Sequence, residues 1–140
     1  MTKDLRPTRI ARLAAALFDA PMAAFCRAEG DDLRLEAAVG ADTPSIERGL
    51  LALCRRALRD DLILDADLRQ ESQGGEALPA GSGPGFRFAA ATVLRDTTGR
   101  IQGAVCVADR LPRPDGGQEG RRLLSDFGAL VAEQGGAPDA

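Results

Sequence analysis

Two apolar runs in the second half of the chain, residues 86–95 and 101–108, constrain the fold most. A short polar segment that contains Gly99 separates them, as is typical of a hairpin turn. Alternation in such runs gives each strand one face toward a core. We therefore expect two antiparallel strands at the centre of a sheet, with Phe86 and Phe88 on one face of the first. In the second strand we expect one face to carry Ile101, Gly103, Val105 and Val107, and the other to carry Gln102, Ala104, Cys106 and Ala108.

Shorter strand patterns lie in the first half of the chain. Residues 22–27 are short and apolar, Gly30 and Asp31 offer a turn, and apolar residues then alternate at Leu33, Leu35, Ala37 and Val39. This pattern predicts a second hairpin. A third signal, residues 62–64, indicates a short buried strand that stops at Asp65. Residues 66–84 are rich in glycine and have no apolar period, so we expect a long irregular connection.

Three segments have the spacing of amphipathic helices. The first spans 4–20 and carries Ile10, Leu13, Ala14, Leu17 and Phe18. The second follows the N-cap Thr43 and has an apolar face of Ile46, Leu50, Leu53 and Ala57, with Arg55, Arg56 and Arg59 expected in solvent near its C-terminus. The third is expected to begin at a cap formed by Asp115 and Gln118, to bury Leu123, Phe127, Leu130 and Val131, and to end at Gly135 and Gly136. The element order predicts an α+β domain with an antiparallel sheet.

Length and charge limit the possible partners. A chain of 140 residues is sufficient for one domain, which we expect over residues 1–134, followed by a short flexible tail at 135–140. Its formal charge of −3 argues against a nucleic-acid partner. No stretch is apolar over a membrane-spanning length, and the apolar run at 13–18 is too short for a secretory signal. We therefore expect a cytoplasmic protein without a membrane partner.

Missing residue types exclude much catalytic chemistry. The chain has no histidine, tryptophan, tyrosine or asparagine, so Ser-His-Asp and Cys-His nucleophiles and HExxH zinc sites are excluded. Cys26, Cys54 and Cys106 are widely spaced and form no CxxC pair, and we expect each to act as a small buried apolar residue. We expect no metal and no cofactor.

Four strings, in order along nearly the whole chain, resemble the GAF domain, a sensor relative of the PAS fold found in bacterial signalling proteins. They are LCRRAL at 53–58, LD at 64–65, GFRFAAATVL at 85–94 and QGAVCVAD at 102–109. The resemblance implies a central antiparallel sheet of five or six strands. It places the N- and C-terminal helices on one face of the sheet, and a helix with the long loop on the other face, where they cover a pocket.

The same resemblance implies a set of ligand-binding candidates, namely Leu53, Cys54, Asp65, Arg87, Phe88 and Cys106. Arg87 is the residue expected to hold an anionic ligand group, although it is equally suited to solvent or to a pair with Asp65. The family's helix histidine is replaced by Arg56 and its strand tyrosine by Ala89. Bilin attachment beside histidine is therefore not expected. The family's cyclic-nucleotide signature is absent as well, because it requires asparagine.

Three functions are open at this point. The first is a non-enzymatic sensor or regulatory domain that binds an unidentified small molecule in signalling and acts on an unknown effector protein. The second is a cysteine-dependent enzyme similar to free methionine-(R)-sulfoxide reductase, which is also a GAF protein. The third is a purely structural homodimer through the terminal helices, where Ala14, Ala15 and Ala16 permit close approach.

Overall fold

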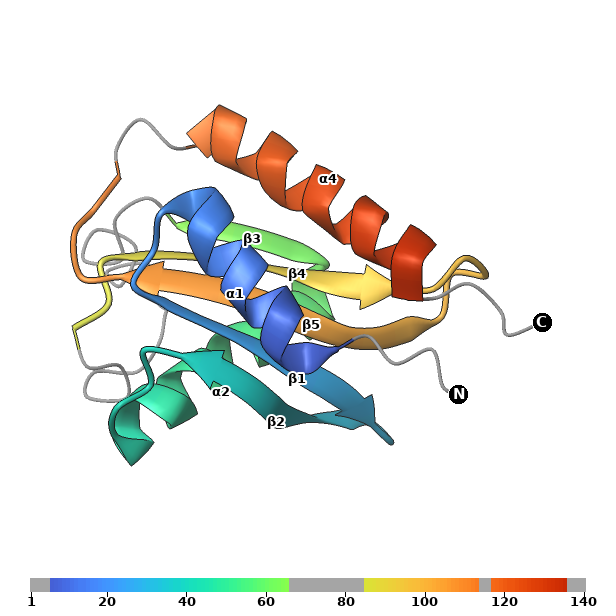
Figure 1. Cartoon of the computed structure of the whole chain (residues 1–140), viewed down its shortest axis with the longest axis horizontal. Helices are drawn as coiled ribbons and strands as arrows, with labels where there is room; N and C mark the ends of the chain where they lie inside the picture. Colours follow the sequence, from blue (N-terminus) through green and yellow to red (C-terminus); the bar gives the residue numbers. More distant parts are fainter. Residues whose placement is uncertain (1–5, 66–84, 114–116, 136–140) are drawn as a thin grey trace.

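A computed structural model describes residues 6–65, 85–113 and 117–135, and shows one antiparallel sheet with three helices (Figure 1). The strands lie in the order β2-β1-β5-β4-β3. The elements are α1 (Pro7–Phe18), β1 (Met22–Glu29), β2 (Asp32–Val39), α2 (Pro44–Asp60), β3 (Leu62–Asp65), β4 (Phe88–Arg95), β5 (Ile101–Asp109) and α4 (Gly117–Gly135). The α+β class and the five-stranded antiparallel sheet are confirmed.

The helices form two layers around the sheet. Helices α1 and α4 cover one face and α2 covers the other (Figure 1). Each face has its own apolar cluster. The cluster under α1 and α4 includes Phe18, Phe25, Phe88, Leu124 and Phe127. The cluster under α2 includes Leu50, Leu53, Cys54, Phe86 and Cys106. The sheet therefore separates two cores. Successive residues of a strand point to opposite faces, so they join the two cores in turn.

The ends of α2 follow from local chemistry. The Thr43 side chain accepts a hydrogen bond of 3.2 Å from the backbone N–H of Ile46, as an N-cap does, and Pro44 occupies the first turn. At the other end Asp61 has φ 73° and ψ −53°, outside the helical region, and its N–H donates to the carbonyl oxygen of Ala57. The chain turns sharply at Asp61 and enters β3.

The terminal helices bury different residues from those expected. On α1 the buried positions are Ile10, Ala11, Ala14, Ala15 and Phe18, whereas Leu13 and Leu17 are 53% and 42% exposed. On α4 the buried stripe is Leu124, Phe127 and Val131, and Leu130 is 55% exposed. The prediction that Leu130 faces the core was wrong. With 100° of rotation per residue, Leu130 lies on the side of the helix, outside the buried stripe of Leu124, Phe127 and Val131.

A β-bulge changes the predicted alternation of β2. Phe25 pairs with Ala37, but the next residue, Cys26, pairs with Leu35, so Glu36 is an extra residue. An extra residue reverses the face on which later side chains lie. Leu33 and Leu35 accordingly join the α2 cluster, while Val39 packs against the α1 cluster. The prediction of one shared face for Leu33, Leu35, Ala37 and Val39 was wrong.

The central hairpin departs from expectation in the same way. Leu94 pairs with Gly103 and Arg95 with Ile101, which leaves Gln102 as an extra residue. Ile101 therefore packs on the α2 side, not beside Val105 as predicted.

Several sequence predictions fall outside the described residues. These are the helix start at Asp4, the connection at 66–84, the cap at Asp115 and the tail after Gly135. Among the helices that the structure describes, none has the length and apolar character needed to cross a membrane.

Candidate functional site

Three of the predicted ligand-binding residues lie together under α2. Leu53 and Cys54 come from the helix and Cys106 from β5, and all three belong to the same apolar cluster. None of the three has any exposed surface. A side chain with no accessible surface borders no space large enough for water. These residues therefore belong to the packed interior and do not line an open pocket.

The apolar cluster under α2 contains three thiols, those of Cys26, Cys54 and Cys106. Cys26 and Cys106 lie on neighbouring strands, where Cys26 pairs with Ala104 and Cys106 with Ala24, and Cys54 approaches both from α2. The Cys106 thiol donates a hydrogen bond of 3.4 Å to the carbonyl oxygen of Leu50. Burial raises the pKa of the Cys54 thiol, and the neighbouring thiols of Cys106 and Cys26 raise this pKa further. Because the thiolate is the reactive form, burial and the raised pKa disfavour reaction at Cys54.

Phe88 lies on the opposite face of the sheet. Its ring joins the cluster under α1 and α4, with its centroid 6.3 Å from that of Phe18, and the Arg113 guanidinium lies 4.7 Å above it. The prediction that Phe86 and Phe88 share a face was wrong, because β4 begins only at Phe88 and Phe86, which precedes it, packs under α2. Phe88 is therefore separated by the sheet from Leu53, Cys54 and Cys106.

The polar part of the site is an ion pair between α2 and β3. Arg56 Nη1 donates to Asp65 Oδ2 at 2.9 Å, and the two side chains are only 17% and 11% exposed. Asp65 is the last residue of β3 and pairs with Ala89 of β4. Arg56 was expected in solvent, and that prediction was wrong because the short β3 strand returns along α2 and brings Asp65 to it.

Arg87 lies at the start of β4, at the same end of the sheet. It is half-buried, and its backbone N–H donates a hydrogen bond of 2.8 Å to the carbonyl oxygen of Asp109. The end of β3 and the start of β4 thus bring Asp65 and Arg87 to the same end of the sheet, where Arg56 of α2 contacts Asp65. Sequence periodicity did not identify Arg56 as a site residue. The one signal for it was its place at the helix-histidine position of the GAF resemblance.

This arrangement favours the binding of anions over metal chemistry. Over residues 6–65, 85–113 and 117–135, no three histidine, cysteine or acidic side chains are grouped so as to hold a metal ion. A guanidinium binds carboxylate and phosphate groups through paired hydrogen bonds. An anionic group that enters beside Arg56 would compete with Asp65 for it.

Comparisons with known proteins rest on structure, since no protein-family model and no curated protein matches the sequence. The type II free methionine-R-sulfoxide reductase of Thermoplasma acidophilum superposes with a TM-score of 0.66 at 17% identity, covering 89% of this chain and 86% of the reductase. The GAF domain of an Acinetobacter phosphoenolpyruvate-protein phosphotransferase gives 0.64 at 11% identity, over 94% and 81% of the two chains. A putative GAF sensor protein from Burkholderia vietnamiensis gives 0.66 at 16% identity, over 94% and 77%.

These similarities, together with the strand order and the two helix layers, define the class. The chain has a GAF-domain fold. Both sensor domains and reductases are among the structures that share it.

Proposed function

We propose that this chain is a non-enzymatic sensor or regulatory domain that binds a small anionic molecule and acts in cytoplasmic signalling. The observation that carries the proposal is the largely buried ion pair between Arg56 and Asp65. A buried ion pair contributes little net stability compared with apolar residues of similar size. Its presence where α2, β3 and β4 meet is therefore better explained by recognition of a charged ligand than by stability.

The ligand's anionic group is assigned to Arg56 and Arg87, with Asp65 as the partner that it displaces. Leu53, Cys54 and Cys106 have no exposed surface, so we assign them to the packed layer under α2 and not to contact with the ligand. Phe88 is left out of the proposed site, since it lies on the other face of the sheet.

The experiment is a thermal-shift titration with succinate and with inorganic phosphate as probes. Ligand at 100 times its Kd stabilises the folded state by about 2.7 kcal/mol, which is readily measured as a rise in Tm. We expect the rise in the wild type and in Arg59→Ala, a matched change at an exposed position of α2. We expect its loss in Arg56→Ala and in Arg87→Ala. An equal rise in all four proteins would overturn the proposed site.

The alternative is an enzyme similar to the free methionine-(R)-sulfoxide reductases. The structural similarity to the Thermoplasma acidophilum reductase and the convergence of three thiols favour it. Burial of all three thiols and the raised pKa of Cys54 weigh against it. Methionine-R-sulfoxide reduction with dithiothreitol as reductant, assayed in the wild type, Cys54→Ser and Cys106→Ser, decides between the two. Turnover that disappears with either cysteine would replace the sensor proposal with the reductase.

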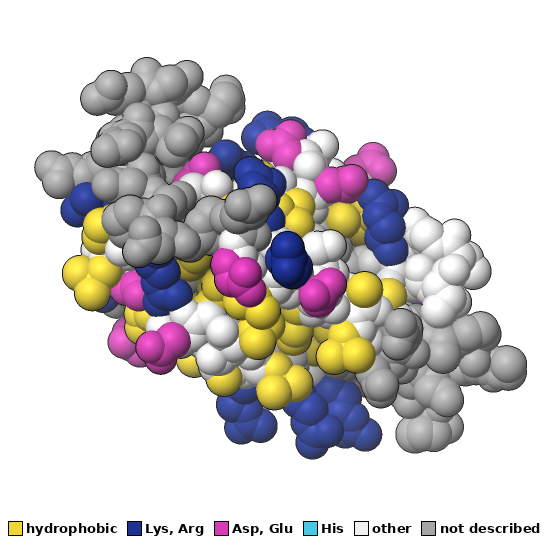
Figure 2. All heavy atoms as spheres, turned by 90° about the horizontal axis from the view of Figure 1, so that it is seen from above, with side chains coloured by type: hydrophobic (Ala, Val, Ile, Leu, Met, Phe, Trp, Pro, Cys, Tyr) yellow, Lys and Arg dark blue, Asp and Glu magenta, His cyan; other side chains and the backbone are white. Residues whose placement is uncertain are grey.

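A homodimer through the terminal helices is compatible with the sensor. Helix α1 buries alanines and exposes Leu13 and Leu17, and α4 exposes Leu130. Figure 2 shows apolar side chains gathered among charged ones on the face that these helices cover. We expect light scattering to give the mass of a dimer and the Leu13→Glu, Leu17→Glu double variant to give a monomer. Leu111→Glu, at a site 67% exposed elsewhere, is the control and should remain dimeric.

A further inference from the structure

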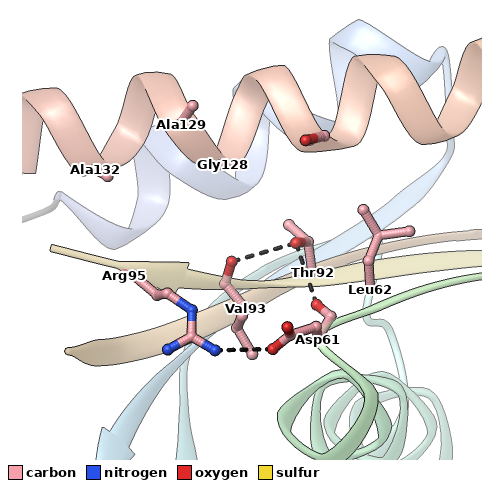
Figure 3. Close-up of a pocket in the computed structure, with 9 residues that line it drawn as sticks. Asp61, Leu62, Thr92, Val93, Arg95, Gly128, Ala129 and Ala132 are labelled. Atoms are coloured by element: carbon pink, nitrogen blue, oxygen red, sulfur yellow. Dashed lines mark hydrogen bonds and ion pairs between the residues drawn. The ribbon is translucent and has the colours of Figure 1, made fainter. Parts of the chain in front are cut away.

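A surface cavity of about 350 Å³, open to solvent, lies between α4 and the β3–β4 strand pair (Figure 3). Its helix side is formed by Ser125, Gly128, Ala129 and Ala132, and its sheet side includes Leu62 and Thr92. Figure 3 shows Leu62 and Thr92 pointing toward the helix from the strands. The sheet separates this cavity from the Arg56–Asp65 pair, so the two sites are distinct.

The space exists because α4 is asymmetric about its buried stripe. Leu123 and Leu130 lie on one flank of that stripe, and the small residues Ser125, Ala129 and Ala132 lie on the other. The residues of α4 that line the cavity on this flank are all small. At Gly128 the helix stands close enough that an added Cβ would meet Thr92 Cγ2 at 3.6 Å. Helix and sheet thus touch at Gly128 and leave room beside it.

The polar groups of the cavity are carbonyl and hydroxyl oxygens. Thr92 Oγ1 lies 3.3 Å from both the Asp61 and the Val93 carbonyl oxygens. The nearest charges neutralise each other, since Arg95 Nη2 and Asp61 Oδ1 are 2.9 Å apart. Ser125 adds an exposed hydroxyl from the helix. These groups suit a neutral ligand that donates a hydrogen bond.

We propose that this cavity binds a small, neutral, mostly apolar molecule that carries a hydroxyl group. The apolar part packs against Leu62, Ala129 and Ala132, and the ligand hydroxyl donates its hydrogen bond to Thr92 Oγ1. The volume falls in the range of about 300–1,000 Å³ that small-molecule sites occupy.

The probe is 2-naphthol, whose fluorescence can be followed directly because the chain has no tryptophan or tyrosine. We expect saturable binding to the wild type. Ala129→Leu fills the cavity with a good helix former and should weaken binding at least about tenfold. Ala16→Leu, the same change at an exposed position of α1, should leave binding unchanged.

The role of the hydroxyl is tested by Thr92→Val, which preserves shape. We expect this variant to lose the preference for 2-naphthol over naphthalene while still binding naphthalene. If urea titrations show that Ala129→Leu does not fold, Ala132→Leu replaces it as the filled variant. Three results would each overturn the proposal: no saturable binding to the wild type, undiminished binding to the filled variant, or equal loss in Ala16→Leu. The succinate and phosphate titrations on Ala129→Leu separately report the Arg56 site.

Discussion

Arg56 and Asp65 join α2 to the end of β3 through a hydrogen bond of 2.9 Å between Nη1 and Oδ2, with both side chains mostly buried. Because β3 is an edge strand of the sheet, this contact joins the helix to the sheet edge. Removal of one partner leaves the charge of the other in a place with little water. Stability and the proposed ligand binding therefore depend on the same pair.

Arg56→Met should lower the free energy of unfolding by about 1–3 kcal/mol, because the Asp65 carboxylate loses its partner. Adding Asp65→Asn to this variant should restore part of the loss, since the stranded charge is removed. Urea unfolding of both single variants and the double variant measures the coupling. The control is Arg55→Met, whose partner Asp32 is well exposed, and it should shift the midpoint far less. Additive losses in the double variant would show that Arg56 and Asp65 do not interact.

Arg113 connects three elements, and its loss should destabilise the fold by about 2–3 kcal/mol. Its guanidinium donates to the carbonyl oxygens of Phe18 and Asp19 at the end of α1, donates to Asp109 Oδ2, and lies over the Phe88 ring. Arg113→Leu should lower the urea midpoint, whereas Arg9→Leu at an exposed position of α1 should not. Equal midpoints for the two variants would contradict a linking role for Arg113.

The same contact makes stability depend on acid. Burial acts to raise the pKa of Asp109, but hydrogen bonds from the Arg113 guanidinium and the Leu111 N–H outweigh it, so the pKa lies below its ordinary 3.8. A lowered folded-state pKa gives stability that is complete above the unfolded pKa and is lost as pH falls through the folded one. Between about pH 5 and 2, the Arg113→Leu variant should therefore lose stability less steeply than the wild type. Parallel curves of unfolding free energy against pH would exclude this account.

Two glycines should respond to alanine in opposite directions. A Cβ at Gly103 would overlap the carbonyl oxygen of Cys26 on β1, so Gly103→Ala should destabilise by about 3 kcal/mol. A Cβ at Gly128 meets its neighbours at 3.6–3.9 Å, which is ordinary contact. Gly128→Ala should stabilise the helix by about 1 kcal/mol. Thermal unfolding of both variants tests this pair, and a change of the same sign in each would contradict it.

Asp61 has a backbone conformation that favours glycine. Its φ of 73° is rare for residues with a side chain, and its ion pair with Arg95 is well exposed and contributes little. Asp61→Ala keeps the strain and removes the pair, whereas Asp61→Gly relieves the strain. The glycine variant should be more stable than the alanine variant by about 1 kcal/mol. Urea midpoints check the order, and the reverse order would show that the turn is not strained.

Element order and helix capping could be predicted from the sequence, while strand faces could be predicted only in part. Thr43 and Pro44 mark a helix start through local chemistry, and the structure has that cap. Alternation predicts faces only along an unbroken ladder, and the extra residues Glu36 and Gln102 break it. Nothing in the local pattern distinguishes a bulge from a regular strand, because its cause lies in the partner strand.

The candidate site shows the same limit. Asp65 was a candidate through the GAF resemblance, as the residue at the end of a strand, but its contact with Arg56 depends on how β3 returns along α2. Periodicity assigned Arg56 to solvent because arginine near a helix C-terminus is usually exposed. Phe88 and Cys106 lie on opposite faces because of the register between β4 and β5, in which Phe88 pairs with Asp109 and Ala91 with Cys106. Alternation within one strand does not specify that register.

The three thiols under α2 have a practical consequence. A thiol reagent such as 5,5′-dithiobis(2-nitrobenzoate) reaches Cys26, Cys54 or Cys106 only when the apolar cluster between α2 and the sheet opens, because none of them has exposed surface. The rate at which the native cysteines are modified therefore reports how often this cluster opens. A ligand that holds α2 in place slows this rate, and one that loosens it speeds the rate. The rate of cysteine modification is therefore a direct measure of motion on the α2 face of the sheet.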